Sequence, residues 1–443
     1  MLLKAYKSNY IFIILTAEEA CQIGCPPVWT TSNGGLMIPW KLIAQPMSMR
    51  SRLLFFLLLT PLVLSGCGGA SGIPGSPAPV LDLSKHRDLS TNRVEPILSD
   101  RQTASGSSTP TDFDYLEVDS PCVIDDDQRN DRFMLFYEGI DGGQPDSAIG
   151  LVTSTEEDFE LFTIDRTMVL SAANMPDLNV NGTLEQPFGA GDPTVLLDTS
   201  FAIGVDGRYR MWFEGTYGLV GLISAILTCT SGDGITWSTP IFCTGLEPGP
   251  AFGTVIRVSD PSVERTPVPT APLQMAFEVG RIDGSSVIGM AFSTDGVDWT
   301  ISDGILTGAP AGPVFTGGPG SFDNFSVRAP SIAREVDSSG NLIEWHMFYE
   351  GLPFNPAIDN DSVIGYATSI DGFSWSGFLT AVLDPSSDLV APPLFDSDDI
   401  KQPTVLLPEP EPNGPRFLLY YAGDPQVPLI SDEVNRIGLA EGS

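Results

Sequence analysis

The stretch STDGVDW at residues 293–299 decides the fold, because the chain repeats it as SGDGITW at 231–237 and SIDGFSW at 369–375. Asp-Gly between two strand-like runs favours a tight hairpin, since Gly accepts a positive φ and Asp tolerates one. The Ser and Asp side chains can accept hydrogen bonds from turn amides, and the Trp opens the next strand. Each phrase therefore predicts one hairpin corner with an aromatic anchor.

The corner belongs to a longer unit. Upstream lie runs such as SSVIGMAF at 285–292 and FMLFYEG at 133–139. Five copies of the unit recur every 64 to 76 residues, marked by Glu138, Glu214, Glu278, Glu350 and Ala422. Each copy also begins with a proline, namely Pro121, Pro193, Pro261, Pro330 and Pro403. Short strands in a repeat of this length predict an all-β fold, a five-bladed β-propeller of four-stranded antiparallel blades.

The fifth copy lacks its outer strand, because the sequence ends with the third-strand motif NRIGLAEGS at 435–443. A similar run, NRVEPILSD at 92–100, precedes the first blade without a hairpin partner. We expect it to pair with residues around 435–441, since an open ring would leave a sheet edge exposed. Pro96 suits an outermost strand, where one amide faces solvent. The propeller is therefore predicted to be closed by an N-terminal strand.

The N-terminal segment predicts export. Arg50 and Arg52 precede a short apolar run, and LSGC at 64–67 resembles the bacterial lipobox, in which the cysteine carries lipid. Residues 1–66 are expected to hold a misassigned start and a lipoprotein signal peptide, 67–90 a flexible tether, and 91–443 the propeller. The protein is thus predicted to be lipid-anchored at Cys67 in the cell envelope, in the outer membrane or periplasm.

Charge and cysteine content set further expectations. The chain has 22 basic and 56 acidic residues, which disfavours nucleic-acid binding, and we expect a monomer. Three cysteines follow Cys67. Cys229 and Cys243 flank the SGDGITW corner symmetrically, so a cross-strand disulfide is a candidate in an oxidising compartment. Cys122 is expected to be free and buried.

Carboxylates are the main candidates for chemistry, because the sequence has only two histidines and no Gly-x-Ser-x-Gly motif. In a propeller the innermost strands begin near the axis, so residues just before each repeated proline should line a central channel. They are Asp119, Asp192, Asp260, Arg328, Lys401 and Gln402. Positions that differ between blades can serve one asymmetric ligand. The alternative is that the Asp side chains cap local turns, with Arg328 and Lys401 balancing their charge.

The Glu that ends the second strand is a different case. It recurs in four blades, and repetition favours a structural hydrogen bond over a role in one asymmetric site.

These motifs together resemble the five-bladed β-propeller glycoside hydrolase-like superfamily, which includes arabinanases, β-xylosidases, invertases and levansucrases. The resemblance covers about residues 110–443. It implies that Asp119 acts as base or nucleophile, that Asp192 orients substrate and tunes the acid, and that Arg328 binds sugar hydroxyls. The third blade departs from the family pattern, because Asp260 stands near the family's Glu position. Glu278 is a substitute acid. Asp119 also lies one residue further from its proline than the pattern places it.

The first hypothesis is an envelope-anchored glycoside hydrolase acting on furanoside or related glycans. Such cleavage needs one protonated and one ionised carboxyl group across the sugar ring. The alternative is a non-catalytic propeller lipoprotein that binds a glycan or Ca²⁺, for which carboxylate oxygens are suitable ligands. A third possibility is a scaffold that presents loops to a partner protein. Ca²⁺ is the one cofactor candidate.

Overall fold

The computed structural model describes residues 81, 83–87, 92–100, 112–141, 146–218, 223–269, 272–302, 312–319, 321–353, 361–387, 394–408, 416–425 and 435–442. Cys67, the predicted signal segment 1–66 and most of the tether lie outside these residues. Within them the fold is all-β, with two short 3₁₀ turns and no helix long and apolar enough to cross a membrane.

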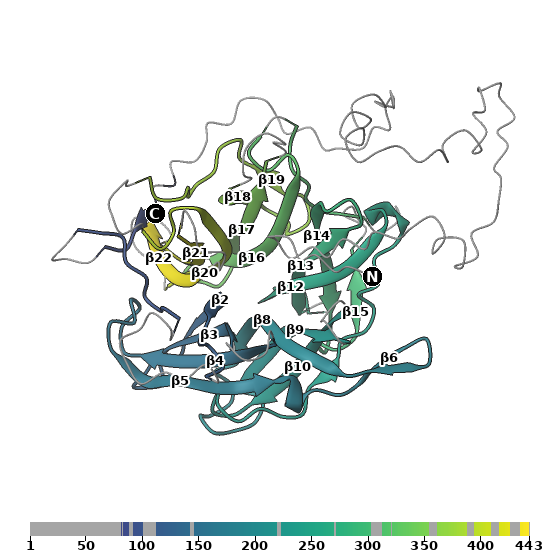
Figure 1. Ribbon diagram of the computed structural model, residues 1–443, viewed down its shortest axis with the longest axis horizontal. Coiled ribbons are helices and arrows are strands. Elements are labelled where there is room, and N and C mark those ends of the chain that lie inside the picture. Colours follow the sequence, from purple (N-terminus) through teal and green to yellow (C-terminus); the bar gives the residue numbers. More distant parts are fainter. Residues whose placement is uncertain are drawn as a thin grey trace, which may run out of the picture. The chain divides into compact units, whose positions relative to one another are not determined.

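Five four-stranded antiparallel sheets form the blades (Figure 1). Blade 1 contains β2 (Glu117–Asp125), β3 (Phe133–Ile140), β4 (Ser147–Ser154) and β5 (Phe162–Ser171). Blade 2 contains β8 (Pro187–Leu197), β9 (Tyr209–Tyr217), β10 (Ile223–Ser231) and β11 (Ile241–Phe242). Blade 3 contains β12 (Val255–Arg265), β13 (Leu273–Arg281), β14 (Ser286–Ser293) and β15 (Trp299–Ile301). Blade 4 contains β16 (Ser326–Val336), β17 (Leu342–Leu352), β18 (Val363–Ser369) and β19 (Ser376–Gly377). Blade 5 contains β20 (Asp399–Leu406), β21 (Phe417–Asp424), β22 (Arg436–Gly442) and β1 (Ser84–Lys85).

The blades close into a ring around a central channel. Each of the innermost strands β2, β8, β12, β16 and β20 contacts those of both neighbouring blades, including β20 with β2. A separate hairpin of β6 (Leu178–Val180) and β7 (Thr183–Glu185) stands between blades 1 and 2 in sequence. The predicted five-bladed propeller is confirmed.

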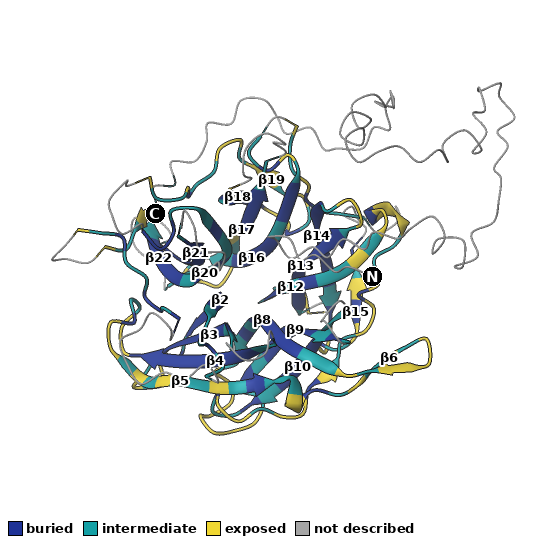
Figure 2. Ribbon diagram, in the orientation of Figure 1, coloured by how far each residue is buried: buried dark blue, intermediate teal, exposed yellow. Residues whose placement is uncertain are grey.

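The core is divided into five apolar clusters, each filling the space between two adjacent blades. Met134 and Phe136 of blade 1, for example, pack with Met211 and Phe213 of blade 2. Buried side chains follow the inner strands of every blade, whereas exposed positions gather in hairpins and outer strands (Figure 2). Packing between blades therefore holds the ring together, because each sheet alone would leave both faces uncovered.

The repeated Ser-x-Asp-Gly phrase forms the predicted corner between the third and fourth strands. In blade 3, Ser293 Oγ accepts from the amide of Gly296 at 2.7 Å, and Asp295 Oδ1 accepts from the amides of Val297 and Asp298, both at 2.9 Å. Gly296 has φ of +74°, which most side chains disfavour. The corners at 231–237 and 369–375 have the same bonds.

The same corners also join neighbouring blades. Trp212 of blade 2 donates from Nε1 to the Gly296 carbonyl at 2.8 Å, and Gln274 of blade 3 donates to the Gly372 carbonyl at 2.7 Å. A Cβ atom on Gly372 would lie only 2.9 Å from the Gln274 amide. The phrase recurs because it makes both a turn and a contact between blades.

The N-terminal segment closes the ring through two stretches, of which only one was predicted. Ile97 donates to the carbonyl of Ile437 at 2.8 Å, and Leu98 pairs with Ile437, so part of the 92–100 run does lie beside β22. The regular outer strand, however, is β1, whose Ser84 and Lys85 pair with Glu441 and Ala440. A bridge between Arg87 and Val94 folds the segment back, so that two stretches share the β22 edge.

A buried ion pair fixes the closing strand. Lys85 Nζ lies 2.6 Å from Asp396 Oδ2, and it also donates to the Asp384 carbonyl at 2.6 Å. Asp396 has no solvent exposure, and Tyr421 also donates to its Oδ2 at 2.9 Å. β1 therefore belongs to the folded propeller although it lies within 67–90.

The predicted disulfide between Cys229 and Cys243 is wrong, because both thiols are free. Cys229 points into the cluster between blades 1 and 2, whereas Cys243 packs against the cluster between blades 2 and 3. The two side chains thus lie on opposite faces of one sheet, and no bridge can form across it. Cys122 is free and buried, as expected.

Candidate functional site

Each innermost strand contains the same β-bulge in its first half. The ladder with the second strand shifts at this point in all five blades, as between Asp119 and Cys122 or Gly191 and Thr194. The residue directly before each proline has a positive φ of 45° to 48°, and these residues are Ser120, Asp192, Asp260, Ala329 and Gln402. A left-handed non-glycine residue is strained by about 1–3 kcal/mol. Because all blades share it, the bulge is part of the scaffold that shapes the channel mouth.

The bulge sorts the predicted residues into two layers. Asp192, Asp260 and Gln402 are the left-handed residues next to the proline, whereas Arg328 and Lys401 lie one residue earlier in the strand. Asp119 belongs to the earlier layer, and Ser120 takes its place beside Pro121. This explains why Asp119 lies one residue further from its proline than the family pattern.

These residues mark one end of the central channel, which we call the carboxylate end. The channel is lined by all five innermost strands from the bulge onwards, and its cavity has a volume of about 280 Å³. Beyond the mouth the lining includes the apolar side chains Val195, Val263, Ile332 and Val405. The charged residues Asp125, Glu264 and Arg334 also line the channel, toward the other ends of their strands.

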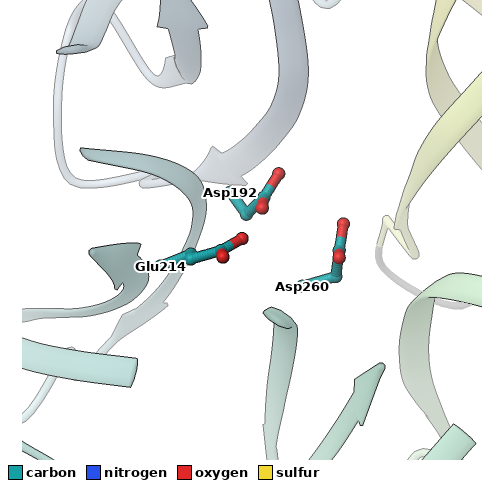
Figure 3. A group of neighbouring side chains, drawn as sticks. All are labelled: Asp192, Glu214 and Asp260. Carbon is teal, nitrogen blue, oxygen red and sulfur yellow. The ribbon is translucent and has the colours of Figure 1, made fainter. Parts of the chain in front are cut away.

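Three carboxylates meet at this mouth, as Figure 3 shows: Asp192, Glu214 and Asp260. One oxygen of each lies within 4.8 Å of the others. Asp192 Oδ1 accepts from Ser120 Oγ at 2.6 Å and from Gln402 Nε2 at 3.3 Å. Its carboxyl group also shares a hydrogen bond with Glu214.

Burial and mutual repulsion keep this cluster partly protonated. Burial, followed by Glu214, raises the pKa of Asp192 well above its usual value. Burial and the neighbouring Asp192 do the same to the pKa of Asp260. Burial also raises the pKa of Glu214 to about 7 and that of Glu138 to about 8. At neutral pH the mouth thus holds carboxyl groups that can donate a proton, as general acids do.

Glu278 is held in the opposite state. It accepts from Arg257 Nη2 at 2.7 Å, from Ser286 Oγ at 2.7 Å and from the amide of Ala329 at 3.4 Å. Burial alone would raise its pKa, but Arg257 and Arg328 outweigh burial, and the pKa of Glu278 is lowered. An ionised carboxylate with three donors is poorly suited to the substitute-acid role that the sequence suggested for it.

Asp119 lies on the blade 5 side of the mouth. Asn435 donates to its Oδ2 at 2.7 Å, and the amide of Ser120 donates to Oδ1 at 2.9 Å. Burial raises the pKa of Asp119, and the nearby Lys401 opposes the rise. Asp119 therefore has hydrogen-bond donors suited to an ionised base, together with a cation that favours ionisation.

The two predicted cations differ in their partners. Arg328 donates from Nε to Glu350 Oε1 at 2.8 Å within blade 4. The matching position in blade 5 pairs Lys401 with Ala422, which has no carboxylate to offer. Burial lowers the pKa of Lys401, but Asp119 and Glu350 raise it further, so that the net shift is upward. Lys401 is thus a charged ammonium that acts mainly on Asp119 and Glu350 in the neighbouring blades rather than on a cross-strand partner in blade 5.

The repeated Glu has the structural bond predicted for it in two blades. The Glu138 carboxylate accepts from the amide of Asp192 in blade 2, and Glu278 accepts from Ala329 in blade 4. Each bond supports the strained bulge of the next blade. Glu138 and Glu214 also belong to the acidic site, because both interact with Asp192 at the mouth. Sequence symmetry had assigned them to the scaffold alone.

Arg257 is a further site residue that the sequence analysis missed. It lies three residues before Asp260 on β12, and its side chain is 40% exposed. The sequence analysis compared only the one or two residues directly before each proline. Arg257 lies further upstream, in VIRVSDPS at 255–262, and a longer comparison would have included it.

A second group of carboxylates, Asp398, Asp399 and Asp424, also brings oxygens within 4.8 Å of one another. Ser362 donates to Asp399 from its amide at 2.6 Å, so at least this carboxylate has a local role. The group lies at the start of β20 and the end of β21, outside the bulge of blade 5.

No family model and no curated protein sequence matches the chain. Solved structures share its fold. A glycosyl hydrolase from Bacteroides ovatus has a TM-score of 0.54 at 16% identity and covers 84% of this chain and 96% of its own. An N-acetylgalactosamine deacetylase from F. plautii, in complex with blood group B trisaccharide, has a TM-score of 0.51 at 15% identity, with coverage of 78% and 94%.

The catalytic domain of a GH62 α-L-arabinofuranosidase from Coprinopsis cinerea is similar at a TM-score of 0.51 and 11% identity, covering 79% of this chain and 95% of that domain. The structural neighbours are thus glycoside hydrolases and related proteins with the five-bladed propeller fold. At these identities the likeness establishes the fold, and activity has to be argued from the site.

Proposed function

We propose that the protein is an envelope-anchored glycoside hydrolase that acts on furanoside or related glycans at the carboxylate end of its channel. The observation that carries the proposal is the cluster of Asp192, Glu214 and Asp260, partly protonated and open to the mouth. Carbohydrate chemistry among the structural neighbours supports it. The lipobox-like LSGC at 64–67 supports the anchor.

The roles follow from the protonation states. Asp192 holds a proton beside Glu214 and can deliver it to the leaving oxygen of a glycosidic bond. Asp119 can serve as the second carboxyl group on the opposite side of the sugar, where its hydrogen-bond donors and Lys401 favour the ionised form against the effect of burial. The ionised Glu278 lies next to Asp260 and favours its protonation. Its partner Arg257 has the opposite effect and limits the rise in pKa of all three carboxyl groups of the cluster.

The test is a hydrolysis panel of furanosides and pyranosides, with reducing-sugar release as the readout. Asp260→Asn should abolish turnover of any glycan that the chain cleaves. Asp337→Asn is the matched control, since Asp337 caps the hairpin between β16 and β17 at the other end of the channel. Hydrolysis that survives Asp260→Asn would contradict the assigned site.

The same three carboxylates favour a second candidate function, a non-catalytic propeller that binds Ca²⁺ or a glycan with Ca²⁺. Hard oxygen ligands from Asp192, Glu214 and Asp260 suit that ion, and binding would relieve their mutual repulsion. Calorimetric titration with Ca²⁺ separates the two. Tight binding lost in Asp260→Asn, together with no hydrolysis of any glycan, would favour the binding protein.

A further inference from the structure

The path of the N-terminal segment fixes the end of the propeller at which the chain enters. β22 begins at the carboxylate end, because Asn435, directly before it, contacts Asp119. It ends at Gly442, opposite Phe417 at the start of β21. β1 runs antiparallel to β22, with Ser84 opposite Glu441 and Lys85 opposite Ala440. The chain therefore enters at the end opposite the carboxylates, the far end, and runs toward them.

Eight of the fourteen exposed large apolar side chains in the described part of the chain lie at the same end. The hairpins that join the first to the second strand and the third to the fourth strand all lie there. These hairpins and the start of β17 expose eight large apolar residues, which we call the anchor face: Leu161, Phe201, Ile203, Val205, Ile235, Val268, Ile343 and Ile370. Leu161 and Ile370 are 78% and 79% exposed. Groups of exposed apolar residues of this kind mark surfaces that contact another body.

We propose that the anchor face lies on the lipid bilayer to which the chain is tethered, so that the carboxylate mouth points away from the membrane. This inference rests on the proposed anchoring through Cys67. The Gly- and Ser-rich sequence from Cys67 to Ser84, taken as the tether that its composition predicts, would have a root-mean-square reach of roughly 20–25 Å. An inner strand of 11 residues such as β12 is about 35 Å long. The far end is therefore the end that the tether holds near the lipid.

Because the chain is tethered, a weak contact between the anchor face and the bilayer is enough to hold the proposed orientation. A short linker gives an effective concentration in the millimolar range, so each aliphatic tip needs to contribute little. The corners also carry acidic groups, because Asp233 precedes Ile235 and Asp371 follows Ile370. Their charge opposes anionic lipids, and the bilayer surface that fits this face is zwitterionic.

The experiment is hydroxyl-radical footprinting of the lipidated chain on phosphatidylcholine vesicles, read by mass spectrometry and compared with Cys67→Ser in solution. Oxidation should be lost at Leu161, Ile235 and Ile370. It should be unchanged at Ile282, which is 71% exposed on the hairpin between β13 and β14 at the carboxylate end. The double variant Leu161→Asp, Ile370→Asp should restore oxidation at Ile235.

Equal oxidation of Ile235 and Ile370 on vesicles and in solution, or protection at Ile282, would overturn the orientation. A second arm couples Cys67 of the exported chain to a maleimide lipid, in a Cys243→Ser background. This coupling provides a lipid anchor whether or not the cell attaches one. Absence of lipid on Cys67 in the natural chain would therefore count against the anchoring proposal alone, and neither arm depends on hydrolysis.

Discussion

Replacing Glu214 with Gln should stabilise the propeller at alkaline pH. Glu214 is 7% exposed, and burial raises its pKa to about 7 from an ordinary value of 4.5. Its neighbours Glu138 and Asp260 oppose its ionisation, whereas Arg257 favours it. Gln keeps the shape of the side chain and can still accept a hydrogen bond from Asp192, but it carries no charge.

The size of the expected stability difference follows from the raised pKa of Glu214. A shift of this size corresponds to roughly 3 kcal/mol between the protonated and ionised forms in the folded state. Because the folded pKa is raised, the contribution of Glu214 to stability is fully present below about pH 4.5. It is lost as pH rises through about 7. We therefore expect the variant and the natural chain to differ little at pH 4.5. At pH 8.5 the variant should be more stable by up to about 3 kcal/mol.

Urea unfolding at several pH values, followed by intrinsic Trp fluorescence, measures this difference. Comparing the unfolding free energies of the two chains at the same pH removes the contribution of the other titrating groups, provided that the urea m-value is the same for both chains. A gap that is constant with pH, or that widens toward acid, would refute the assignment of Glu214 as a buried acid with a raised pKa.

Three further outcomes are expected. Asp192→Asn should lower the rate of glycan hydrolysis by about 10²–10⁴-fold, as loss of a general acid does, with little change in thermal stability. A collapse of stability at unchanged activity would instead support the turn-capping alternative. Lys401→Met should raise the pKa of Asp119 and move the acidic limb of the pH–rate profile to higher pH, because the ammonium favours the ionised carboxylate. An unmoved limb would show that Lys401 acts elsewhere. Lys85→Ala should cost about 3–5 kcal/mol in unfolding measurements, since it removes the ammonium partner of the buried Asp396 side chain. A loss near zero would mean that β1 does not fasten the ring.

The repeat made the architecture predictable, because blade number and strand order follow from periodic sequence. The contacts of Gln274 and Trp212 with neighbouring blades could not be predicted from the repeat. Both support a neighbouring corner by hydrogen bonds that no local pattern reveals. The outer strand β1 escaped prediction for a similar reason. Ser84 and Lys85 are too short a run to show strand periodicity, and their pairing depends on contacts with residues about 300 positions away.

The site was predictable only in outline. The position before each proline identified Asp192 and Asp260, but comparison by blade symmetry excluded Glu214. Its role is asymmetric although its residue type repeats, because Glu214 has the acidic neighbours Asp260 and Glu138, whereas the matching Glu350 of blade 4 pairs with Arg328. Protonation states depend on burial and on distances across blades, and these are properties of the folded ring rather than of the sequence.

The most direct test of the central claim is a crystal structure of the Asp192→Asn variant with an oligosaccharide from the hydrolysis panel. The account predicts a sugar ring at the carboxylate end of the channel, within hydrogen-bond distance of Asp260 and Glu214 and with Asp119 on its other side. A glycan bound at the far end or along an outer strand, with the carboxylate mouth empty, would contradict it.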